Sequence, residues 1–174
     1  MSGLNSEDEL MDLVDSNDRV IGQISRERAY SDGIHNIRVV NAFLRNSKGQ
    51  LWIPVRSKNK RLFPGGLDFS VGGHVTAGED YEDALIRETQ EELGIDLGST
   101  PFKQTGYFKA KESGLNSFMK IYEIEYEAVP KFNRDDFSGY SWLRPAEILK
   151  QIESGSKSKD DLKIVIKLLY PHAN

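Results

Sequence analysis

Cysteine is absent from the 174-residue chain, and only three histidines are present. Disulfide bonds, a thiolate nucleophile and cysteine-based zinc sites are therefore excluded. The sequence also contains no Walker loop and no dinucleotide-binding glycine fingerprint. The nucleotide-binding folds that depend on those loops are therefore not supported.

Long hydrophobic runs are missing as well. No segment approaches the ~18 apolar residues of a membrane span, and the acidic N-terminus lacks the apolar run of a signal peptide. Lys and Arg total 23 against 27 Asp and Glu, and the resulting net charge of -4 disfavours nucleic acid as a bulk partner. We therefore expect a cytoplasmic protein with neither a membrane nor a nucleic-acid partner.

The composition is that of an ordinary globular chain, with 38% hydrophobic and 29% charged residues and no internal repeat. This length predicts one domain over residues 1–174 with a sizeable core. Hydrophobic periodicity and turn residues predict a hairpin at about 10–30, strands at 37–45, 51–55, 67–75, 102–111, 117–127 and 140–143, a helix at 80–93, and C-terminal helices within 145–170. Pro54 indicates a free edge or a bulge in its strand. A mixed sheet between helices, an α/β fold, is the economical packing.

Three carboxylates on the helix at 80–93 form what we call the acidic cluster: Glu88, Glu91 and Glu92. Their i, i+3, i+4 spacing places them on one helix face, where like charges repel. A solvated acidic face and a metal site both agree with this pattern. Carboxylate oxygens suit Mg²⁺ or Mn²⁺, which can neutralise phosphate oxygens and activate a water for diphosphate hydrolysis.

The residues around the cluster make the metal site the better hypothesis. Residues 73–95 contain Gly73, Glu79 after five residues, Arg87-Glu88 after seven more, then Glu91-Glu92 and Gly94. This pattern resembles the Nudix box, and a chance match at one start point is on the order of 10⁻⁸. Thr89 departs from it, because the family has a bulky aliphatic residue there. The resemblance implies a Nudix-like α/β/α sandwich with a mixed central sheet and a pyrophosphohydrolase activity.

The resemblance also implies roles for individual residues. Glu88, Glu91 and Glu92 would hold the metal ions, and the carbonyl of Gly73 is a further candidate ligand. Arg87 would orient a glutamate through a salt bridge, and Glu79 would act from the loop or brace Arg87. The general base is left open between Glu91, Glu92 and a later loop that contains Asp135 and Asp136.

Motifs outside the box resemble the branch that includes the isopentenyl-diphosphate isomerases, for example Lys48-Gly49-Gln50-Leu51 and the run from Phe63 to His74. That isomerase protonates an alkene with a cysteine at the position that Gly72 occupies here, and its further metal-binding histidines fall near Ser31 and Arg38. The isomerase activity is therefore disfavoured. A non-catalytic Nudix-fold sensor of nucleotides or sugar phosphates is the remaining alternative.

The small-molecule substrate is expected to be a nucleoside di- or triphosphate. Nucleotide sugars, dinucleotides and prenyl diphosphates remain alternative substrates, because the residues of the box do not recognise the group that is attached to the diphosphate. Arg38, Arg56 and His74 are the candidate substrate-binding residues. The N-terminal hairpin is a candidate contact of a homodimer.

Overall fold

The computed structural model describes residues 9–173. The strands of its main sheet are β3 (Arg38–Arg45), β4 (Leu51–Arg56), β5 (Val71–His74), β6 (Phe102–Phe108), β7 (Phe118–Glu125) and β8 (Phe137–Leu143). They lie in the order β6-β7-β3-β4-β8, with β5 paired to β3. β3 runs parallel to β7 and antiparallel to β4 and β5, so the sheet is mixed.

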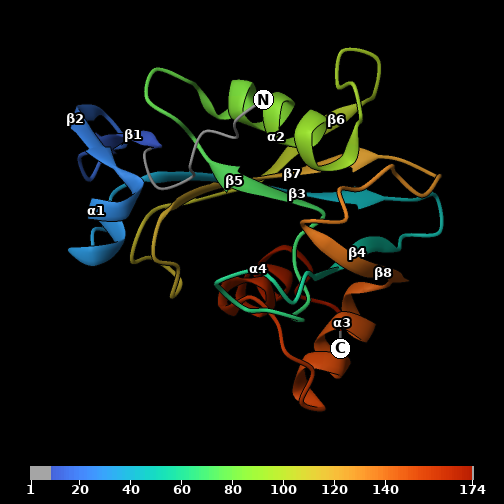
Figure 1. Ribbon diagram of the computed structural model, residues 1–174. Helices are drawn as coiled ribbons and strands as arrows, with labels where there is room; N and C mark the ends of the chain where they lie inside the picture. The colour runs from blue at the N-terminus through green and yellow to red at the C-terminus, as the bar shows by residue number, and fades with distance from the viewer. Residues whose placement is uncertain (1–8, 174) are drawn as a thin grey trace.

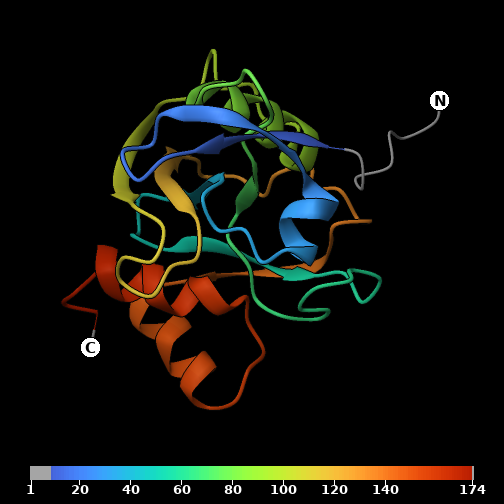
Figure 2. The same cartoon turned by 90° about the vertical axis from the view of Figure 1, so that its left-hand side faces the viewer.

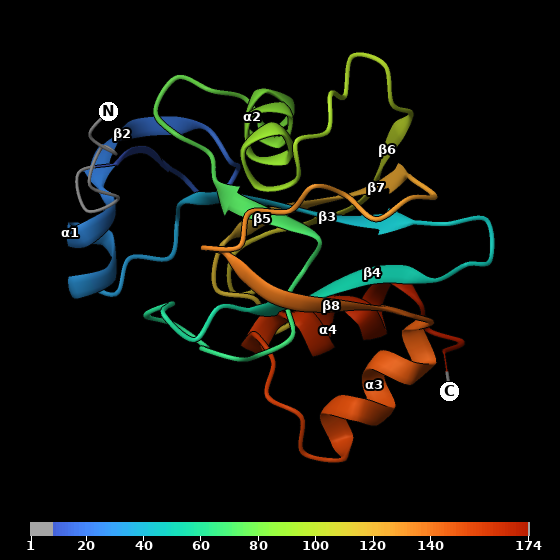
Figure 3. The ribbon, with the colours of Figure 1, turned by 45° about the vertical axis from the view of Figure 1, so that its right-hand side comes forward.

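Helices cover both faces of this sheet. They are α2 (Tyr81–Leu93), α3 (Pro145–Glu153) and α4 (Asp160–Leu169). Figures 1 and 3 show α2 over one face and α3 and α4 against the other. Alternate residues of β3 serve the two layers, because Val40 and Ala42 pack on the α2 side and Phe43 packs on the α4 side. The predicted α/β/α sandwich with a mixed central sheet is confirmed.

Helix α2 is fixed by local chemistry at both ends. The Asp80 side chain accepts hydrogen bonds from the Glu82 and Asp83 backbone N–H groups, and the Asp83 side chain completes a capping box. Gly94 ends the helix in the left-handed conformation, at φ 65°. Ala84, one turn before Glu88, lies in the core between helix and sheet.

Along one edge, strand β3 has two successive partners, β4 and β5. β3 and β4 pair at Arg45 and Leu51, and farther along β3 its partner is β5. β4 has a bulge between Val55 and Arg56, and the Pro54 carbonyl accepts the Asp68 N–H at 3.1 Å. Pro54 therefore lies where β4 leaves β3, as its missing N–H predicts.

Strand β5 is shorter than the stretch 67–75 that the sequence predicts. The Leu67 N–H donates to the Lys157 carbonyl at 2.9 Å, and the Asp68 N–H donates to Pro54. These backbone groups bond to a loop and to β4, so regular pairing with β3 begins only at Val71.

The expected N-terminal hairpin consists of β1 (Leu10–Val14) and β2 (Val20–Ser25), which pair antiparallel. A helix that the sequence reading missed, α1 (Arg26–Ser31), follows directly, and Ser25 caps it. Figure 2 shows the hairpin lying across the molecule next to α2, with α1 at one end. None of the helices within residues 9–173 is long and apolar enough to cross a membrane.

Candidate active site

The acidic cluster lies on the part of α2 that packs beside β5. Glu88 is largely buried, with 12% of its side chain exposed, whereas Glu91 is 60% exposed. Glu92 is partly buried, and its Oε2 accepts a hydrogen bond from the Gly72 N–H at 3.2 Å. The three carboxylates therefore range from the interior to the solvent along one helix face.

Two consecutive glycines of β5 let side chains approach the strand from opposite faces. A Cβ on Gly73 would overlap the carboxyl group of Glu88 and lie 2.7 Å from its Cγ. A Cβ on Gly72 would overlap Oδ1 of Asn41. Both positions need glycine because a neighbouring side chain occupies the space of a Cβ.

Arg87 connects the loop before α2 to the acidic cluster. Its Nε and Nη2 donate to the two oxygens of Glu79 at 2.7 and 2.9 Å, and its Nη1 donates to Glu88 at 2.7 Å. Nη2 also donates to the His74 carbonyl at 3.1 Å. These charge-assisted bonds fix the guanidinium in one orientation. Arg87 thus contacts both Glu79 and Glu88, and the catalytic roles of Arg87 and Glu79 stay predictions.

The buried carboxylates carry negative charge that the protein compensates only in part. Burial raises the pKa of Glu88 to about 7, although the hydrogen bond from Arg87 lowers it. Burial, followed by the negative charge of Glu88, raises the pKa of Glu92 well above its usual range. A divalent cation among these oxygens would remove the repulsion and favour the ionised forms. The donor set therefore fits Mg²⁺ or Mn²⁺, both of which prefer oxygen ligands.

The carboxylates are not arranged as a finished metal cage. Within residues 9–173, no group of three or more His, Asp or Glu side chains converges closely enough to hold an ion. The reason lies in their present partners, because Glu88 is bonded to Arg87 and Glu92 to Gly72, while Glu91 extends into solvent. Rotation of these side chains would be needed to ligate one cation.

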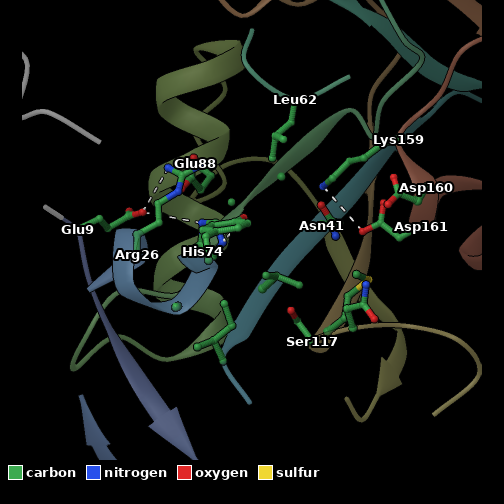
Figure 4. Close-up of a pocket in the computed structure, with 18 of the residues that line it drawn as sticks. Glu9, Arg26, Asn41, Leu62, His74, Glu88, Ser117, Lys159, Asp160 and Asp161 are labelled. Atoms are coloured by element: carbon green, nitrogen blue, oxygen red, sulfur yellow. Dashed lines mark hydrogen bonds and ion pairs between the residues drawn. The ribbon is translucent and has the colours of Figure 1, made fainter. Parts of the chain in front are cut away.

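A pocket of about 1090 Å³ opens in front of the acidic cluster. All three glutamates of the cluster line it, and so do five cationic side chains: Arg26, Arg56, Lys60, Arg87 and Lys159. Figure 4 shows Glu9, Arg26, His74 and Glu88 on one side and Asn41, Lys159, Asp160 and Asp161 on the other. The pocket can thus contact a cation and an anionic ligand at once.

The three residues that the sequence predicts to bind substrate do not all line the pocket. The Nε of Arg38 donates to Asp18 Oδ1 at 2.6 Å and the Arg38 side chain is only 15% exposed. Arg38 does not line the pocket, because this ion pair holds it to the hairpin turn. Arg56 and His74 do line the pocket, and Arg56 also pairs with Asp68.

His74 is a neutral group at the pocket wall. Burial lowers the pKa of His74 to about 3, and the positive charges of Arg26, Lys159 and Arg87 lower it further. Its Nε2 lies 3.2 Å from the Tyr30 hydroxyl. It can therefore hydrogen-bond a ligand but adds no positive charge at neutral pH.

Several pocket residues were missed by the sequence reading, namely Asn41, Lys159 and Asp161. A signal existed for Asn41, because it is a polar residue within the apolar stretch Val39 to Leu44. No local pattern marks Lys159 or Asp161, which reach the pocket from the start of α4, far along the chain.

Comparison with known proteins decides the family. A family model described as the NUDIX domain matches residues 35–162. The chain belongs to the Nudix family. It is 46% identical over 162 residues to an uncharacterized Nudix hydrolase of Nostoc sp., covering 93% of this chain and 96% of that protein. A protein of Deinococcus radiodurans named Nudix hydrolase is 45% identical over 163 residues, with 94% and 95% covered.

Solved structures agree with this assignment. The crystal structure of DR0079 from Deinococcus radiodurans superposes with a TM-score of 0.87 at 45% identity, covering 93% of this chain and 99% of that one. A MutT protein of Methanosarcina mazei, at 23% identity and a TM-score of 0.59, shares the fold over 76% of this chain and 91% of its own. This Nudix protein is accordingly a pyrophosphohydrolase of a family that generally uses divalent metal ions and acts on small molecules.

Proposed function

We propose that this enzyme hydrolyses the diphosphate linkage of a nucleoside di- or triphosphate, with Mg²⁺ or Mn²⁺ as its cation. The proposed ligands are the acidic cluster and the Gly73 carbonyl. One observation carries the proposal: the carboxylates share a pocket with Arg26, Arg56 and Lys159, so that a cation and a polyphosphate can be held together.

The size of the pocket supports a nucleotide. Its volume of about 1090 Å³ slightly exceeds the range of typical small-molecule sites, roughly 300–1,000 Å³. A bare diphosphate would leave most of that space empty, whereas a nucleoside diphosphate adds a sugar and a base. The cationic side chains match the negative charge of the phosphates, although the protein as a whole is acidic.

The residues of the chain are proposed to position the reacting groups. Glu79 fixes Arg87, and Arg87 fixes Glu88, so one network sets the place of a buried carboxylate. Bound divalent cations would neutralise phosphate oxygens and favour deprotonation of the attacking water. Arg56 and Lys159 would bind phosphate oxygens that point away from the acidic cluster.

The base that takes the proton from water is proposed to be Glu91 or Glu92. Both line the pocket, and the Glu91 side chain is mostly exposed, with its Oε2 3.7 Å from Arg87 Nη1. Asp136, from the later loop, also lines the pocket but forms an ion pair with Lys60. Asp135 is not among the pocket residues.

A hydrolase is favoured over an isomerase of the isopentenyl-diphosphate branch that the sequence resembles. The position that would carry the alkene-protonating cysteine is Gly72, which has no side chain. Arg38, at a position where that enzyme has a histidine, is bound to Asp18 instead of facing the pocket. The Deinococcus radiodurans relative at 45% identity, which is named Nudix hydrolase, also supports a hydrolase.

The test is a release assay for phosphate and pyrophosphate with Mg²⁺ or Mn²⁺. The panel holds nucleoside di- and triphosphates, nucleotide sugars and isopentenyl diphosphate. The control is Glu91→Gln/Glu92→Gln, checked for folding by circular dichroism. We expect metal-dependent cleavage of nucleoside di- or triphosphates, reduced at least ~100-fold in the control. Cleavage of only another substrate class would overturn the nucleotide assignment. Binding that raises the melting temperature without any turnover would favour the sensor.

A further inference from the structure

The N-terminal hairpin lies outside the part of the chain that the Nudix family model matches. The match begins at residue 35, after the hairpin and α1. Strand β1 of the hairpin nevertheless contacts the loop between β5 and α2, which belongs to the Nudix box. Met11 forms an antiparallel bridge with Thr76, and the Ala77 N–H donates to the Leu10 carbonyl at 2.8 Å. The hairpin is therefore joined to the box by backbone pairing.

The segment of residues 76–79, which we call the box loop, has an acceptor for each of its four backbone N–H groups. The loop itself provides two of them. The Thr76 N–H donates to Glu79 Oε2 at 2.9 Å, and the Glu79 N–H donates to the Thr76 carbonyl at 3.0 Å. Strand β1 provides the other two, of which one is the side chain of Asp12, whose Oδ2 accepts the Gly78 N–H at 3.0 Å. Half of these hydrogen bonds therefore depend on the hairpin.

Asp12 is the only charged residue of β1, and it is buried, with 6% of its surface exposed. A buried carboxylate loses its hydration, so it needs a hydrogen bond that compensates the loss. The donor here is the N–H group of Gly78, whose φ of 83° lies in the left-handed region that glycine adopts readily. A charge within an apolar strand thus stabilises the turn of the box loop.

The box loop is connected to the acidic cluster through Glu79. This residue follows Gly78 and accepts hydrogen bonds from Nε and Nη2 of Arg87 at 2.7 and 2.9 Å. Arg87 in turn donates to Glu88 at 2.7 Å. A shift of the Gly78 backbone would move Glu79, because a planar peptide unit joins the two residues. The position of Glu88 therefore depends on the hairpin through these contacts.

The hairpin is anchored to the rest of the fold at both of its ends. At its turn, Oδ2 of Asp18 accepts hydrogen bonds from the hydroxyl groups of Tyr81 and Tyr107, both at 2.9 Å. Just before β1, Glu9 Oε2 lies 3.8 Å from His74 Nδ1, and Figure 4 shows these two side chains next to each other. The strand that carries Asp12 is therefore a fixed support for the box loop.

We propose that Asp12 is a positioning residue of the pyrophosphohydrolase. By accepting the Gly78 N–H, it places Glu79 so that Arg87 keeps Glu88 in its orientation. Asp12 would thereby affect catalysis from outside the family pattern, through Glu79 and without contact with the substrate. The inference rests on hydrolysis of a diphosphate linkage and not on the identity of the attached group.

The first experiment compares kcat and KM of Asp12→Leu and Asp15→Leu, with the substrate that the wild type cleaves fastest in the release assay. Asp15 is the matched control in the same hairpin. Its Oδ1 also accepts backbone N–H groups, but those of Asn17 and Arg19, within the hairpin turn. We expect kcat of Asp12→Leu to fall by ~10-fold with a smaller change in KM, and kcat of Asp15→Leu to stay unchanged. An equal fall in both variants would assign the effect to hairpin stability and overturn the inference.

Two further variants at residue 12 complete this comparison. Asp12→Asn, whose amide oxygen can accept the Gly78 N–H, should restore most of the rate. A kcat of Asp12→Asn as low as that of Asp12→Leu would overturn the role of this hydrogen bond. Asp12→Ala, which also lacks the acceptor, replaces Asp12→Leu if circular dichroism shows that the leucine variant does not fold.

A double variant tests whether Asp12 acts through Glu79. Effects of two residues that act through one contact are not additive. In the Glu79→Gln background, Asp12→Leu should therefore lower kcat by less than ~2-fold, in place of the ~10-fold fall in the wild type. A further fall of ~10-fold would show that the two residues act independently, and it would overturn the inference.

A third measurement needs neither substrate nor metal. The Nε–H group of Arg87 donates to Glu79 Oε1 at 2.7 Å, so its proton–nitrogen NMR signal is protected from exchange with water. Arg87→Lys identifies this signal, which should weaken in Asp12→Leu and persist in Asp15→Leu. A weakened signal in Asp12→Leu, with no nucleotide cleaved by the wild type, would support the positioning role and overturn the proposed substrate class. An unchanged signal in Asp12→Leu would overturn the inference, whatever substrate is cleaved.

Discussion

Replacing Glu79 by Gln tests the ion pair that supports the active site. Burial opposes ionisation of Glu79, but the hydrogen bonds from Arg87 and from the Thr76 N–H outweigh it and lower the pKa of Glu79 to about 2. The difference from the ordinary value of 4.5 corresponds to about 3 kcal/mol. Because Glu79 is partly exposed and Gln keeps one acceptor, we expect the loss in unfolding free energy to be about 1–2 kcal/mol.

The pH dependence of the unfolding free energy shows whether the ion pair causes the loss of stability in Glu79→Gln. A carboxylate whose pKa is lowered in the folded state stabilises the fold above its unfolded pKa of 4.5, and this stabilisation disappears as the pH falls towards 2. Urea denaturation should therefore show the full difference between wild type and Glu79→Gln at pH 5 to 7 and a shrinking one below pH 4.5. Glu112→Gln, at an exposed residue, is the control. A difference that is equal at pH 3 and pH 7 would refute the ion-pair explanation.

The same variant should also lose activity. Because Gln keeps one acceptor and has no charge, the guanidinium of Arg87 loses one of its four hydrogen bonds and its ion pair with residue 79, and it holds Glu88 less firmly in one place. We expect kcat to fall by ~10- to 100-fold with a smaller change in KM, because misplacement of a reacting group lowers the rate more than binding. An unchanged kcat at pH 7 would show that Glu88 is positioned without Arg87.

Three further changes give separate expectations. Thr89→Val should raise the melting temperature by ~2–4 °C at unchanged activity, because the buried Thr89 hydroxyl has no partner within the described residues; differential scanning calorimetry checks it. Gly73→Ala should lower kcat by ~100-fold, because the new Cβ displaces Glu88; the release assay measures this, and full activity would contradict it. Arg38→Met should cost about 2 kcal/mol of unfolding free energy in urea, because Asp18 loses its buried partner. The KM of that variant should stay unchanged, since Arg38 lies outside the pocket.

The sequence predicts those features that depend on interactions between residues close together in the chain. Helix α2 could be bounded because Asp80 and Gly94 act within one turn of its ends. The spacing of the acidic cluster follows from helix geometry alone. The length of β5 could not be predicted in this way, because Leu67 and Asp68 bond to distant backbone groups in place of β3.

The substrate side of the pocket was harder to predict for the same reason. Arg38 has a suitable charge on a suitable strand, but its partner Asp18 lies 20 residues away at a hairpin turn. Asp161 and Asn41 are separated by most of the chain and meet the same pocket only because α4 packs on the β3 face. Contacts between segments far apart in the sequence determine which charged side chains can bind a ligand. Hydrophobic periodicity along the sequence does not predict such contacts.

The Gly72-Gly73 pair explains how one pocket can serve both faces of the sheet. Successive residues of a strand point to opposite sides, so Gly73 makes room for Glu88 and Gly72 makes room for Asn41. At these two positions the space beside β5 is therefore filled by Glu88 on one face and by Asn41 on the other. The Nudix pattern requires Gly73 alone, whereas the glycine at position 72 is explained by the close approach of the Asn41 side chain.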